Sequence, residues 1–347
     1  MSTKQKRLMP FLKIRLAIVS VLMAGSSAIA YAEDLSAWKL PPVPVPADNP
    51  QTPAKIALGH QLAFDTRLSK DDALACASCH APVAGGGGPT PRAFGQGGEL
   101  GRWAPSWDNS GYYTSLFWDG RASSLEEQTG ALPGHMGPIT APGEMGGDIA
   151  QVTAKLNKIT GYKKQFNAVF GSDATPENIA KAIASFERTL NATNSPFQQY
   201  VSGNKKAISA SAKRGFELFR GKAMCTACHI PPLLTDNNFH NIGVPSAGPL
   251  KEDNGRFDVT KNDADKGRFK TPSLYNSGSF AFFMHDGSII TMREVVEHYN
   301  KGGTGVPNQD PLIMPLKLSG TEVNDLVAFV NSLTDERLDK IGRPELP

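Results

Sequence analysis

One five-residue pattern, present twice, constrains this chain more than any other feature. The pattern Cys-x-x-Cys-His ends at His80 and again at His229, and its two copies contain all four cysteines of the 347 residues. Two thiols three residues apart and an adjacent imidazole form the attachment signature of c-type haem, in which both thiols form thioethers and the histidine ligates the iron. The predicted attachment and ligand residues are Cys76, Cys79, His80, Cys225, Cys228 and His229.

Disulfides and a zinc site are the alternative uses of four cysteines. Exported proteins often pair their cysteines, and a zinc ion would require the two cysteine pairs to converge. Neither alternative explains a histidine directly after both pairs, and a thioredoxin-like pair does not need that histidine either. The chain is therefore predicted to carry two covalently bound haems.

The first 32 residues are typical of an export signal. Basic residues precede the apolar run "LAIVSVLMAG", and Ala30-Tyr31-Ala32 fits a signal-peptidase site. The apolar run is short for a retained membrane anchor, which is the less favoured alternative. Removing this segment takes away five basic and no acidic residues, so the net charge changes from +3 to −2. We therefore predict a periplasmic protein with no basic run that would suggest nucleic-acid binding.

The remaining chain divides into a lead-in and two halves. Residues 33–53 are rich in proline and are predicted to be extended. An N-terminal haem domain is expected at 54–200 and a C-terminal one at 201–347, with the boundary near 195–208. Apart from the haem motifs, the halves show no clear repeat.

Helix signals dominate and convincing strand alternation is absent, so the predicted fold class is mostly α. Apolar periodicity predicts helices at 54–64 and 209–220. Thr175-Pro176-Glu177 places an N-cap and an N1 proline before a helix that runs to about Leu190. Capping boxes are predicted at Ser123–Glu126, Thr291–Glu294 and Ser319–Glu322.

Two haems in one exported chain leave two kinds of function open. A haem with two strong axial ligands transfers electrons, whereas one with an open or weak sixth position binds peroxide or oxygen. The chain is thus either an electron carrier or an oxidoreductase with one reactive and one relaying haem. Spacing alone does not choose the sixth ligands among the several methionines and tyrosines and His60, His135, His240, His285 and His298.

Five ordered stretches resemble the bacterial dihaem cytochrome c peroxidases, a family that includes the MauG-type enzymes. The resemblance extends from about residue 40 to residue 335. It implies two cytochrome c-like helical domains packed together, with the N-terminal haem reacting with peroxide and the C-terminal haem relaying electrons. The stretches are "LFWDGRASSLEEQ" (116–128), "GPITAPGEMGG" (137–147), "FHNIGV" (239–244), "FKTPSL" (269–274) and "MHDGSIITMREVVEHYNKGG" (284–303).

The resemblance assigns roles around the first haem. His80 would be its proximal ligand, and Glu144 matches the distal glutamate that moves a proton between the peroxide oxygens. Gln128 and Pro138 match neighbouring distal positions, and Trp118 matches a tryptophan placed between the haems. The alternatives are a surface carboxylate at Glu144 and an ordinary core aromatic at Trp118.

For the second haem the resemblance implies His229 as the proximal ligand and Tyr299 as the distal one. Many dihaem peroxidases have a methionine at the position of Tyr299, whereas MauG-type enzymes have tyrosine. A phenolate stabilises ferric and higher oxidation states, while a thioether raises the reduction potential. The alternative is that Tyr299 only packs on its helix and that Met284 or Met314 binds the iron.

Three departures from the family pattern limit what it implies. The loop at 85–101 contains no histidine, which favours an open first haem, although His135 in the insertion "ALPGHM" either reaches that haem or is solvated. An asparagine that binds inter-haem calcium in the family is replaced by Trp103, while the carbonyls at Phe280 and Phe282 persist. The question of calcium therefore stays open. The electron donor is not readable from the sequence either.

We predict an exported dihaem c-type peroxidase that reduces hydrogen peroxide to water. Its electrons would come from a small redox protein, either a cytochrome c or a cupredoxin. The first alternative is a MauG-like enzyme that uses peroxide to oxidise residues of a partner protein. The second is a dihaem electron carrier without enzymatic activity.

Overall fold

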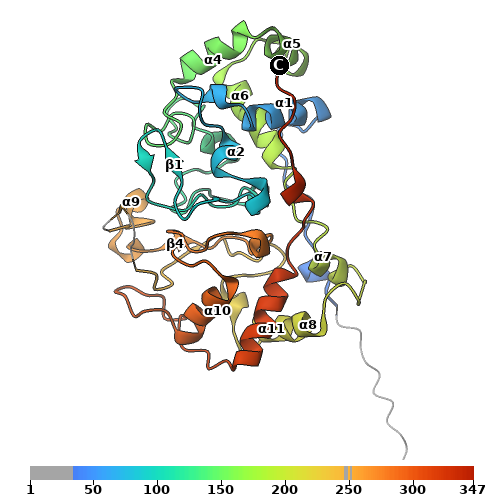
Figure 1. Cartoon of the computed structure of the whole chain (residues 1–347), viewed down its shortest axis with the longest axis vertical. Coiled ribbons are helices and arrows are strands. Elements are labelled where there is room, and N and C mark those ends of the chain that lie inside the picture. Colours follow the sequence, from blue (N-terminus) through green and yellow to red (C-terminus); the bar gives the residue numbers. More distant parts are fainter. Residues whose placement is uncertain (1–33, 246–248, 251) are drawn as a thin grey trace, which may run out of the picture. The chain divides into compact units, whose positions relative to one another are not determined.

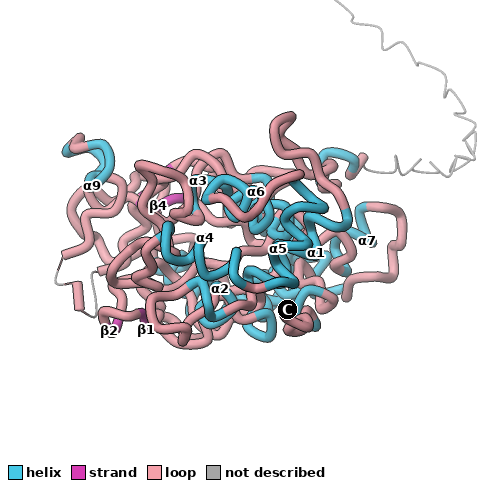
Figure 2. Tube along the Cα trace, turned by 90° about the horizontal axis from the view of Figure 1, so that it is seen from above, coloured by secondary structure: helices cyan, strands magenta, loops and turns pink. Residues whose placement is uncertain are grey.

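The computed structural model describes residues 34–245, 249–250 and 252–347, and Leu35–Pro347 form one compact unit. The predicted signal peptide at 1–32 lies outside the described residues. Helices and long loops make up most of the trace, and the strands are only two residues long (Figures 1 and 2). The predicted mostly α fold class is confirmed. No helix in the described ranges is long and apolar enough to cross a membrane.

The helices connect through loops that carry most of the cavity-lining residues described below. The strands form two antiparallel pairs, β1 with β2 and β3 with β4. The strands are β1 (Phe94–Gly95), β2 (Gly98–Glu99), β3 (Phe239–His240) and β4 (Phe269–Lys270). The helices are α1 (Pro53–Ala63), α2 (Cys76–Cys79), α3 (Leu125–Gln128), α4 (Ile149–Lys158), α5 (Thr160–Phe170), α6 (Pro176–Glu187), α7 (Pro196–Val201), α8 (Ala210–Arg220), α9 (Phe257–Thr260), α10 (Met292–Lys301) and α11 (Gly320–Asn331).

Capping side chains set most helix starts where the sequence predicts them. Both Thr291 and Ser319 form complete capping boxes, and Thr175 accepts a hydrogen bond from the backbone of Asn178. The predicted box at Ser123 is wrong by one residue: Ser124 is the N-cap of α3. Ser123 instead donates its hydroxyl to Glu127 at 2.6 Å.

Each half is built around a pair of helices that cross very closely. At Gly59, where α1 meets α6, an added Cβ atom would lie 1.9 Å from the Ala182 carbonyl oxygen. At Gly215, where α8 meets α11, it would lie 1.9 Å from the Asp325 carbonyl oxygen. Only glycine permits backbones to approach so closely, and the repeated crossing supports two similar haem-bearing halves.

A second repeat contradicts the expectation that the halves share only the haem motifs. Residues 103–122 and 270–289 align with a constant offset and share the pattern Pro-Ser-x-x-Asn-Ser-Gly, followed later by Asp-Gly. Asn109 and Asn276 both adopt left-handed backbone, with φ of 60° and 65°, and so do Phe117 and Met284, with φ of 68° and 71°. The sequence similarity is weak because the side chains between these turns differ.

The two repeats exchange backbone hydrogen bonds. The N–H of Trp103 donates to the carbonyl of His285 at 2.8 Å, and the N–H of Lys270 donates to the carbonyl of Trp118 at 2.8 Å. Trp103 corresponds to Lys270 in the alignment, and Trp118 corresponds to His285. The loops are therefore paired reciprocally, and they meet between the two haem motifs.

The chain ends cross from one half to the other. Leu35 and Trp38, in the lead-in, belong to the apolar core that contains α8 and α11. The C-terminal residues run back beside the first half, where Arg67 donates two hydrogen bonds of 3.1 Å to the Pro347 carbonyl (Figure 1). The predicted boundary near 195–208 stays a prediction, but both terminal segments pack across it.

Candidate functional site

The first haem motif lies on α2 and the residue that follows it. The N–H of Ala75 donates to the Ser78 hydroxyl at 3.0 Å, and the N–H of His80 donates to the Cys76 carbonyl at 2.9 Å, which closes the turn. The His80 ring stacks on Trp107, with 5.6 Å between centroids and 14° between planes. Burial lowers the pKa of His80, so the imidazole is neutral and has a lone pair available for a metal.

A run of four glycines shapes the wall beside this motif. An added Cβ at Gly86 would lie 2.3 Å from Trp107, and one at Gly87 would lie 2.5 Å from Trp103. Gly85 through Gly88 are all buried. This part of the loop at 85–101 is therefore a packing surface for aromatic rings.

The second haem motif holds its histidine by a direct hydrogen bond. His229 donates from Nδ1 to the Leu234 carbonyl at 2.8 Å, and a carbonyl can only accept, so the proton resides on Nδ1. The lone pair of Nε2 is then free for a metal, which is the arrangement expected of an iron ligand. Burial lowers the pKa of His229 as well.

A single cavity of about 620 Å³ connects the two motifs. Its wall is largely apolar and aromatic, which suits flat apolar macrocycles. The four cysteines are free thiols in the structure, so the disulfide alternative is not supported. The donor set therefore fits two c-type haems. Every predicted site residue lines this cavity: Cys76, Cys79, His80, Trp118, Gln128, Pro138, Glu144, Cys225, Cys228, His229 and Tyr299.

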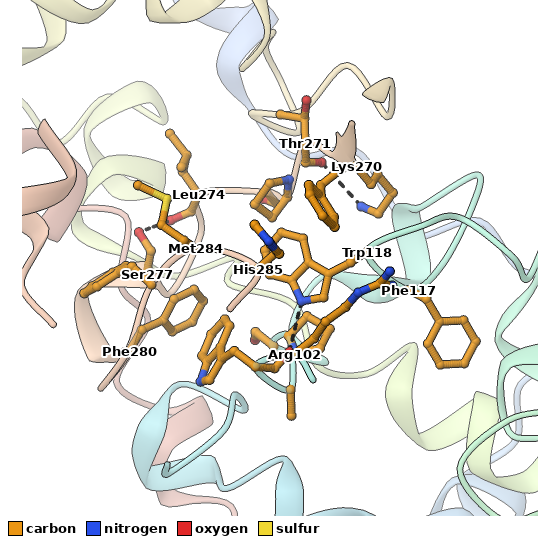
Figure 3. Close-up of a pocket in the computed structure, with 18 of the residues that line it drawn as sticks. Arg102, Phe117, Trp118, Lys270, Thr271, Leu274, Ser277, Phe280, Met284 and His285 are labelled. Carbon is orange, nitrogen blue, oxygen red and sulfur yellow. Dashed lines mark hydrogen bonds between the residues drawn. The ribbon is translucent and has the colours of Figure 1, made fainter. Parts of the chain in front are cut away.

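Trp118 occupies the middle of the cavity wall (Figure 3). Its indole N–H donates to the Trp103 carbonyl at 2.9 Å, and its own carbonyl accepts from the Lys270 N–H at 2.8 Å. Its ring lies 6.5 Å from the His285 ring. Both repeats thus hold Trp118 in place, and its core packing is compatible with a role between two redox groups.

Glu144 faces the cavity from a tightly bonded turn. The Met145 N–H donates to the Pro138 carbonyl at 3.0 Å, and the Gly147 N–H donates to the Ile139 carbonyl at 2.7 Å, so Pro138 and Glu144 are held on one turn. Gln128 ends α3 on the same wall. The side chain of Glu144 is 27% exposed, and the surface-carboxylate alternative does not account for its place in the cavity.

Arg121 is the charged neighbour of Glu144. One of its terminal nitrogens lies 3.6 Å from the Glu144 carboxylate, and the other lies 3.0 Å from Asp119. Its guanidinium stacks 3.4 Å from the centroid of the Phe117 ring. Burial raises the pKa of Glu144 and the charge of Arg121 opposes that rise. Arg121 therefore helps Glu144 to be a carboxylate that can accept a proton.

Arg102 connects the two halves near this point. It makes two bonds of 2.7 Å to Asp253 and one of 2.7 Å to Asp119, a planar arrangement that suits a guanidinium. Its guanidinium also lies 5.4 Å from the Phe269 ring centroid. Because Asp119 bonds both arginines, Arg102 also fixes the carboxylate that orients Arg121.

The candidates for the second sixth ligand all lie at the cavity. Burial raises the pKa of the Tyr299 phenol, and the Cys225 and Cys228 sulfurs contribute, which places Tyr299 beside the second motif. Met284 and Met314 both line the cavity; Met284 is buried, while Met314 is 46% exposed. The position of Tyr299 agrees with the prediction, but the identity of the ligand stays a prediction.

Most of the other histidines are engaged elsewhere. His60 bonds the Gly342 carbonyl and His298 bonds the Ile242 carbonyl, and neither lines the cavity. His135 is exposed, contacts Glu127 and lies outside the cavity wall, in agreement with the solvated alternative. His285, which does line the cavity, stacks on Phe269 at 3.7 Å.

His240 bonds two carboxylates beside the second motif. Its Nδ1 lies 2.7 Å from Asp310 and its Nε2 lies 2.8 Å from Asp236. The Cys228 sulfur is the largest contribution that raises the pKa of His240 to about 10, and Asp310 and Asp236 add to it. Cys228, Asp236 and His240 form the one cluster of metal-ligand type among the described residues, but haem attachment would consume the Cys228 thiol.

The side-chain ligand of the calcium site that the resemblance implies is missing from this chain. Trp103, at the position of the asparagine ligand, is buried and donates its indole N–H to the Gly88 carbonyl at 3.0 Å. Its ring packs 5.2 Å from that of Phe280. An indole supplies no oxygen to a hard cation, so the side chain at this position cannot ligate calcium.

Sequence reasoning missed the lysine and arginine side chains of the cavity wall, which are Arg102, Arg121 and Lys270. Arg121 and Lys270 occur in quoted family stretches, but nothing in their spacing indicates which charges turn inward. The internal repeat was the available signal, because it places Lys270 at the counterpart of Trp103. Recognising it would have directed attention to both loops.

Comparisons with known proteins agree with this geometry. A family model for di-haem cytochrome c peroxidases matches residues 53–206. Cytochrome-c peroxidase IdrP1 of Denitromonas iodatirespirans is 38% identical over 364 residues, covering 93% of each chain. Methylamine utilization protein MauG of Methylorubrum extorquens is 39% identical over 332 residues, covering 93% of this chain and 92% of that protein.

A solved structure is similar throughout. The crystal structure of a MauG-like protein associated with microbial copper homeostasis superposes with a TM-score of 0.80 at 31% identity, covering 90% of this chain and 98% of that one. Several relatives are named cytochrome c peroxidases, among them Ccp of Escherichia coli, which is 36% identical over 300 residues. The chain therefore belongs to the dihaem cytochrome c peroxidase family, the haem oxidoreductases that include MauG.

Proposed function

We propose that the protein is an exported, periplasmic peroxidase that reduces hydrogen peroxide to water with electrons from a small redox protein. The donor would be a cytochrome c or a cupredoxin. The observation that supports this most directly is the shared cavity, in which both haem motifs, Glu144 and Trp118 meet. Hydrogen peroxide takes up two electrons and two protons to give two water molecules.

The cysteines and histidines of the two motifs would hold the cofactors. Cys76 and Cys79 would form thioethers with the first haem, and Cys225 and Cys228 with the second. His80 and His229 are the proposed proximal ligands, because both are neutral and His229 has its Nε2 lone pair free. When bound, the haems supply redox-active iron that reacts with peroxide and stores oxidising equivalents.

Glu144 is the proposed proton carrier. Its carboxylate would take a proton from one peroxide oxygen and return it to the other, so that this second oxygen leaves as water. Arg121 keeps the carboxylate ionised at a lower pH than burial alone would permit. Gln128 and Pro138 would shape the same wall and orient the peroxide.

Trp118 is the proposed bridge for electrons. It forms hydrogen bonds with Trp103 in the first repeat and Lys270 in the second, and it lines the cavity that connects the two motifs. Tyr299 would be the distal ligand of the second haem. Calcium is not part of the proposal, because Trp103 replaces its side-chain ligand.

A second candidate function keeps the peroxide chemistry and replaces the redox donor with residues of a partner protein. Two observations favour considering it: Tyr299 lines the cavity, and MauG relatives match nearly the whole chain. A tyrosine ligand would favour sharing oxidising equivalents between the haems over storing a ferrous iron.

One experiment separates these functions. One equivalent of hydrogen peroxide is added to the as-isolated diferric protein, visible and near-infrared spectra are recorded, and ferrous cytochrome c is added afterwards. Reaction only after one haem is reduced, followed by turnover of the cytochrome, would support the peroxidase. Rapid bleaching of both ferric haems with a near-infrared charge-resonance band would favour the protein-modifying enzyme. A protein whose two haems are both low-spin and do not react with peroxide would be an electron carrier, and the peroxidase and the protein-modifying enzyme would both be refuted.

A further inference from the structure

Lys270 presents a buried positive charge to the cavity. It ends β4, where its backbone is fixed by the bond to Trp118, and the side chain lines the cavity wall (Figure 3). The residue is 6% exposed, and its ammonium nitrogen lies 3.5 Å from the Tyr113 ring centroid. Its one hydrogen bond to an oxygen is a long 3.4 Å contact with the neighbouring Thr271 carbonyl.

The other cations of the cavity wall all have carboxylate partners. Among the described residues, Arg102, Arg121 and Lys270 are the lysines and arginines that line the cavity. Arg102 pairs with Asp119 and Asp253, and Arg121 pairs with Asp119 and Glu144. Lys270 has no carboxylate within ion-pair distance in the described ranges. A buried ammonium without a paired carboxylate is strongly disfavoured. Burial lowers the pKa of Lys270 to about 7, and the more distant charge of Asp236 opposes this shift only in part.

The fold itself does not require a charge at this position. The counterpart of Lys270 in the first half is Trp103, which makes the reciprocal backbone bond with a neutral side chain. The same loop geometry thus forms with an indole. A lysine at this position indicates an anionic group that is specific to the second half.

We propose that the ammonium of Lys270 binds a propionate carboxylate of the haem held by the second motif. The backbone carbonyl of Thr271, the next residue, accepts a hydrogen bond of 2.6 Å from the Thr235 hydroxyl. Thr235 directly follows Leu234, whose carbonyl accepts the hydrogen bond from His229. This places Lys270 on the wall of the second haem. The ammonium and the Tyr113 ring would together enclose the carboxylate, while Trp118 is fixed by the Lys270 backbone.

The proposal rests on the haem occupancy in the proposed function but not on its peroxide chemistry. A cation beside a haem carboxylate favours the reduced haem, because reduction removes positive charge from the iron. Lys270→Met should therefore lower the ferrous-to-ferric ratio of the second haem at a fixed applied potential about tenfold or more, a shift of 59 mV for a one-electron couple. The first haem should change less.

The test is a spectroelectrochemical titration of both haems in the holoprotein, after haem content has been measured. Lys270→Arg, which retains the charge, should restore most of the ratio. Lys266→Met is the matched control, because Lys266 is a surface lysine of the preceding loop paired with Asp263, and it should titrate like the parent protein. A fully loaded Lys270→Met protein with an unchanged second-haem couple would overturn the proposal, and so would an equal loss in Lys270→Arg.

Resonance Raman spectra of the parent protein give an independent readout if the neutral variants do not load haem. A propionate bound by the ammonium should show a hydrogen-bonded bending mode for the second haem, and the frequency of a free propionate would overturn the proposal. A parent holoprotein without peroxidase activity would count against the proposed function. If Lys270→Met still shifted the potential of the second haem, the Lys270 contact would stand.

Discussion

Replacing Arg121 with glutamine should shift the pH dependence of the reaction with peroxide. Glu144 accepts a proton only when it is ionised, so the rate should rise with pH through the pKa of Glu144. Burial already holds that pKa above its ordinary value, and Arg121 opposes the effect. In Arg121→Gln the pKa of Glu144 should rise further because the opposing positive charge is gone. The acid limb of the pH–rate profile should therefore move to higher pH.

The size of the shift follows from the 3.6 Å separation of Arg121 and Glu144. Two unit charges at that distance interact by about 1.2 kcal/mol in a water-like dielectric and about 4.6 kcal/mol at an effective dielectric constant of about 20. The Arg121 side chain is 36% exposed, so solvent screening favours the lower value. About 1.2 kcal/mol corresponds to a rise of roughly 0.9 unit in the pKa of Glu144, and to a reaction about sevenfold slower at pH values below that pKa.

The assay is stopped-flow mixing of the holoprotein with hydrogen peroxide across a series of pH values. Arg121→Lys should keep the limb near its original position because it retains the charge. Arg220→Gln is the control for losing an arginine, since Arg220 pairs with Glu217 on α8 and does not line the cavity. The reasoning would be refuted if Arg121→Gln loaded both haems and its acid limb stayed in place or moved to lower pH.

Three further changes test other parts of the site. Glu144→Gln should slow the reaction with peroxide about 10²–10⁴-fold in stopped flow while the haem spectra stay unchanged, and parental kinetics would remove its proton-carrying role. Tyr299→Phe should alter the absorption and EPR spectra of the second haem alone, and unaltered spectra would return the ligand question to methionine. Gly86→Ala should lower the free energy of unfolding by about 2 kcal/mol or more in denaturant titrations, because the new methyl group meets Trp107 in left-handed backbone. Gly171→Ala, with a similar φ of +71° but open space, should cost only the backbone strain, and equal losses would argue against the steric explanation.

Local signals predicted the helices well. Thr291 and Ser319 cap their helices as expected because a capping box is complete within four residues of sequence. The haem attachment pattern is equally local, since both thiols and the imidazole lie in one turn. Such features depend on neighbours along the chain, and a single sequence contains them in full.

The assembly of the cavity was not readable in the same way. The family resemblance indicated that Glu144 and Trp118 belong near the haems, but not that Arg121 would stack on Phe117 and face Glu144. Long-range pairs such as Arg102 with Asp253 depend on how loops from two halves meet, and no local pattern specifies that meeting.

The internal repeat was hidden for a physical reason. What the repeat preserves is backbone shape, carried by left-handed turns at Asn109 and Asn276, while the residues between the turns have diverged. Trp118 and His285 occupy the same place in the two loops with different side chains. Comparison of amino-acid types therefore finds only the short pattern Pro-Ser-x-x-Asn-Ser-Gly and the later Asp-Gly, although the backbone geometry recurs.

The crossing of the chain ends has a consequence for the separation of the two redox centres. The rate of electron transfer falls steeply with distance, so a hinge motion between the halves would make relay intermittent. Trp38 packs in the apolar core of α8 and α11, and Pro347 accepts hydrogen bonds from Arg67. Separating the two halves therefore requires both terminal segments to detach at once. We expect the halves to unfold as one cooperative unit and the donor–acceptor gap to stay constant throughout turnover.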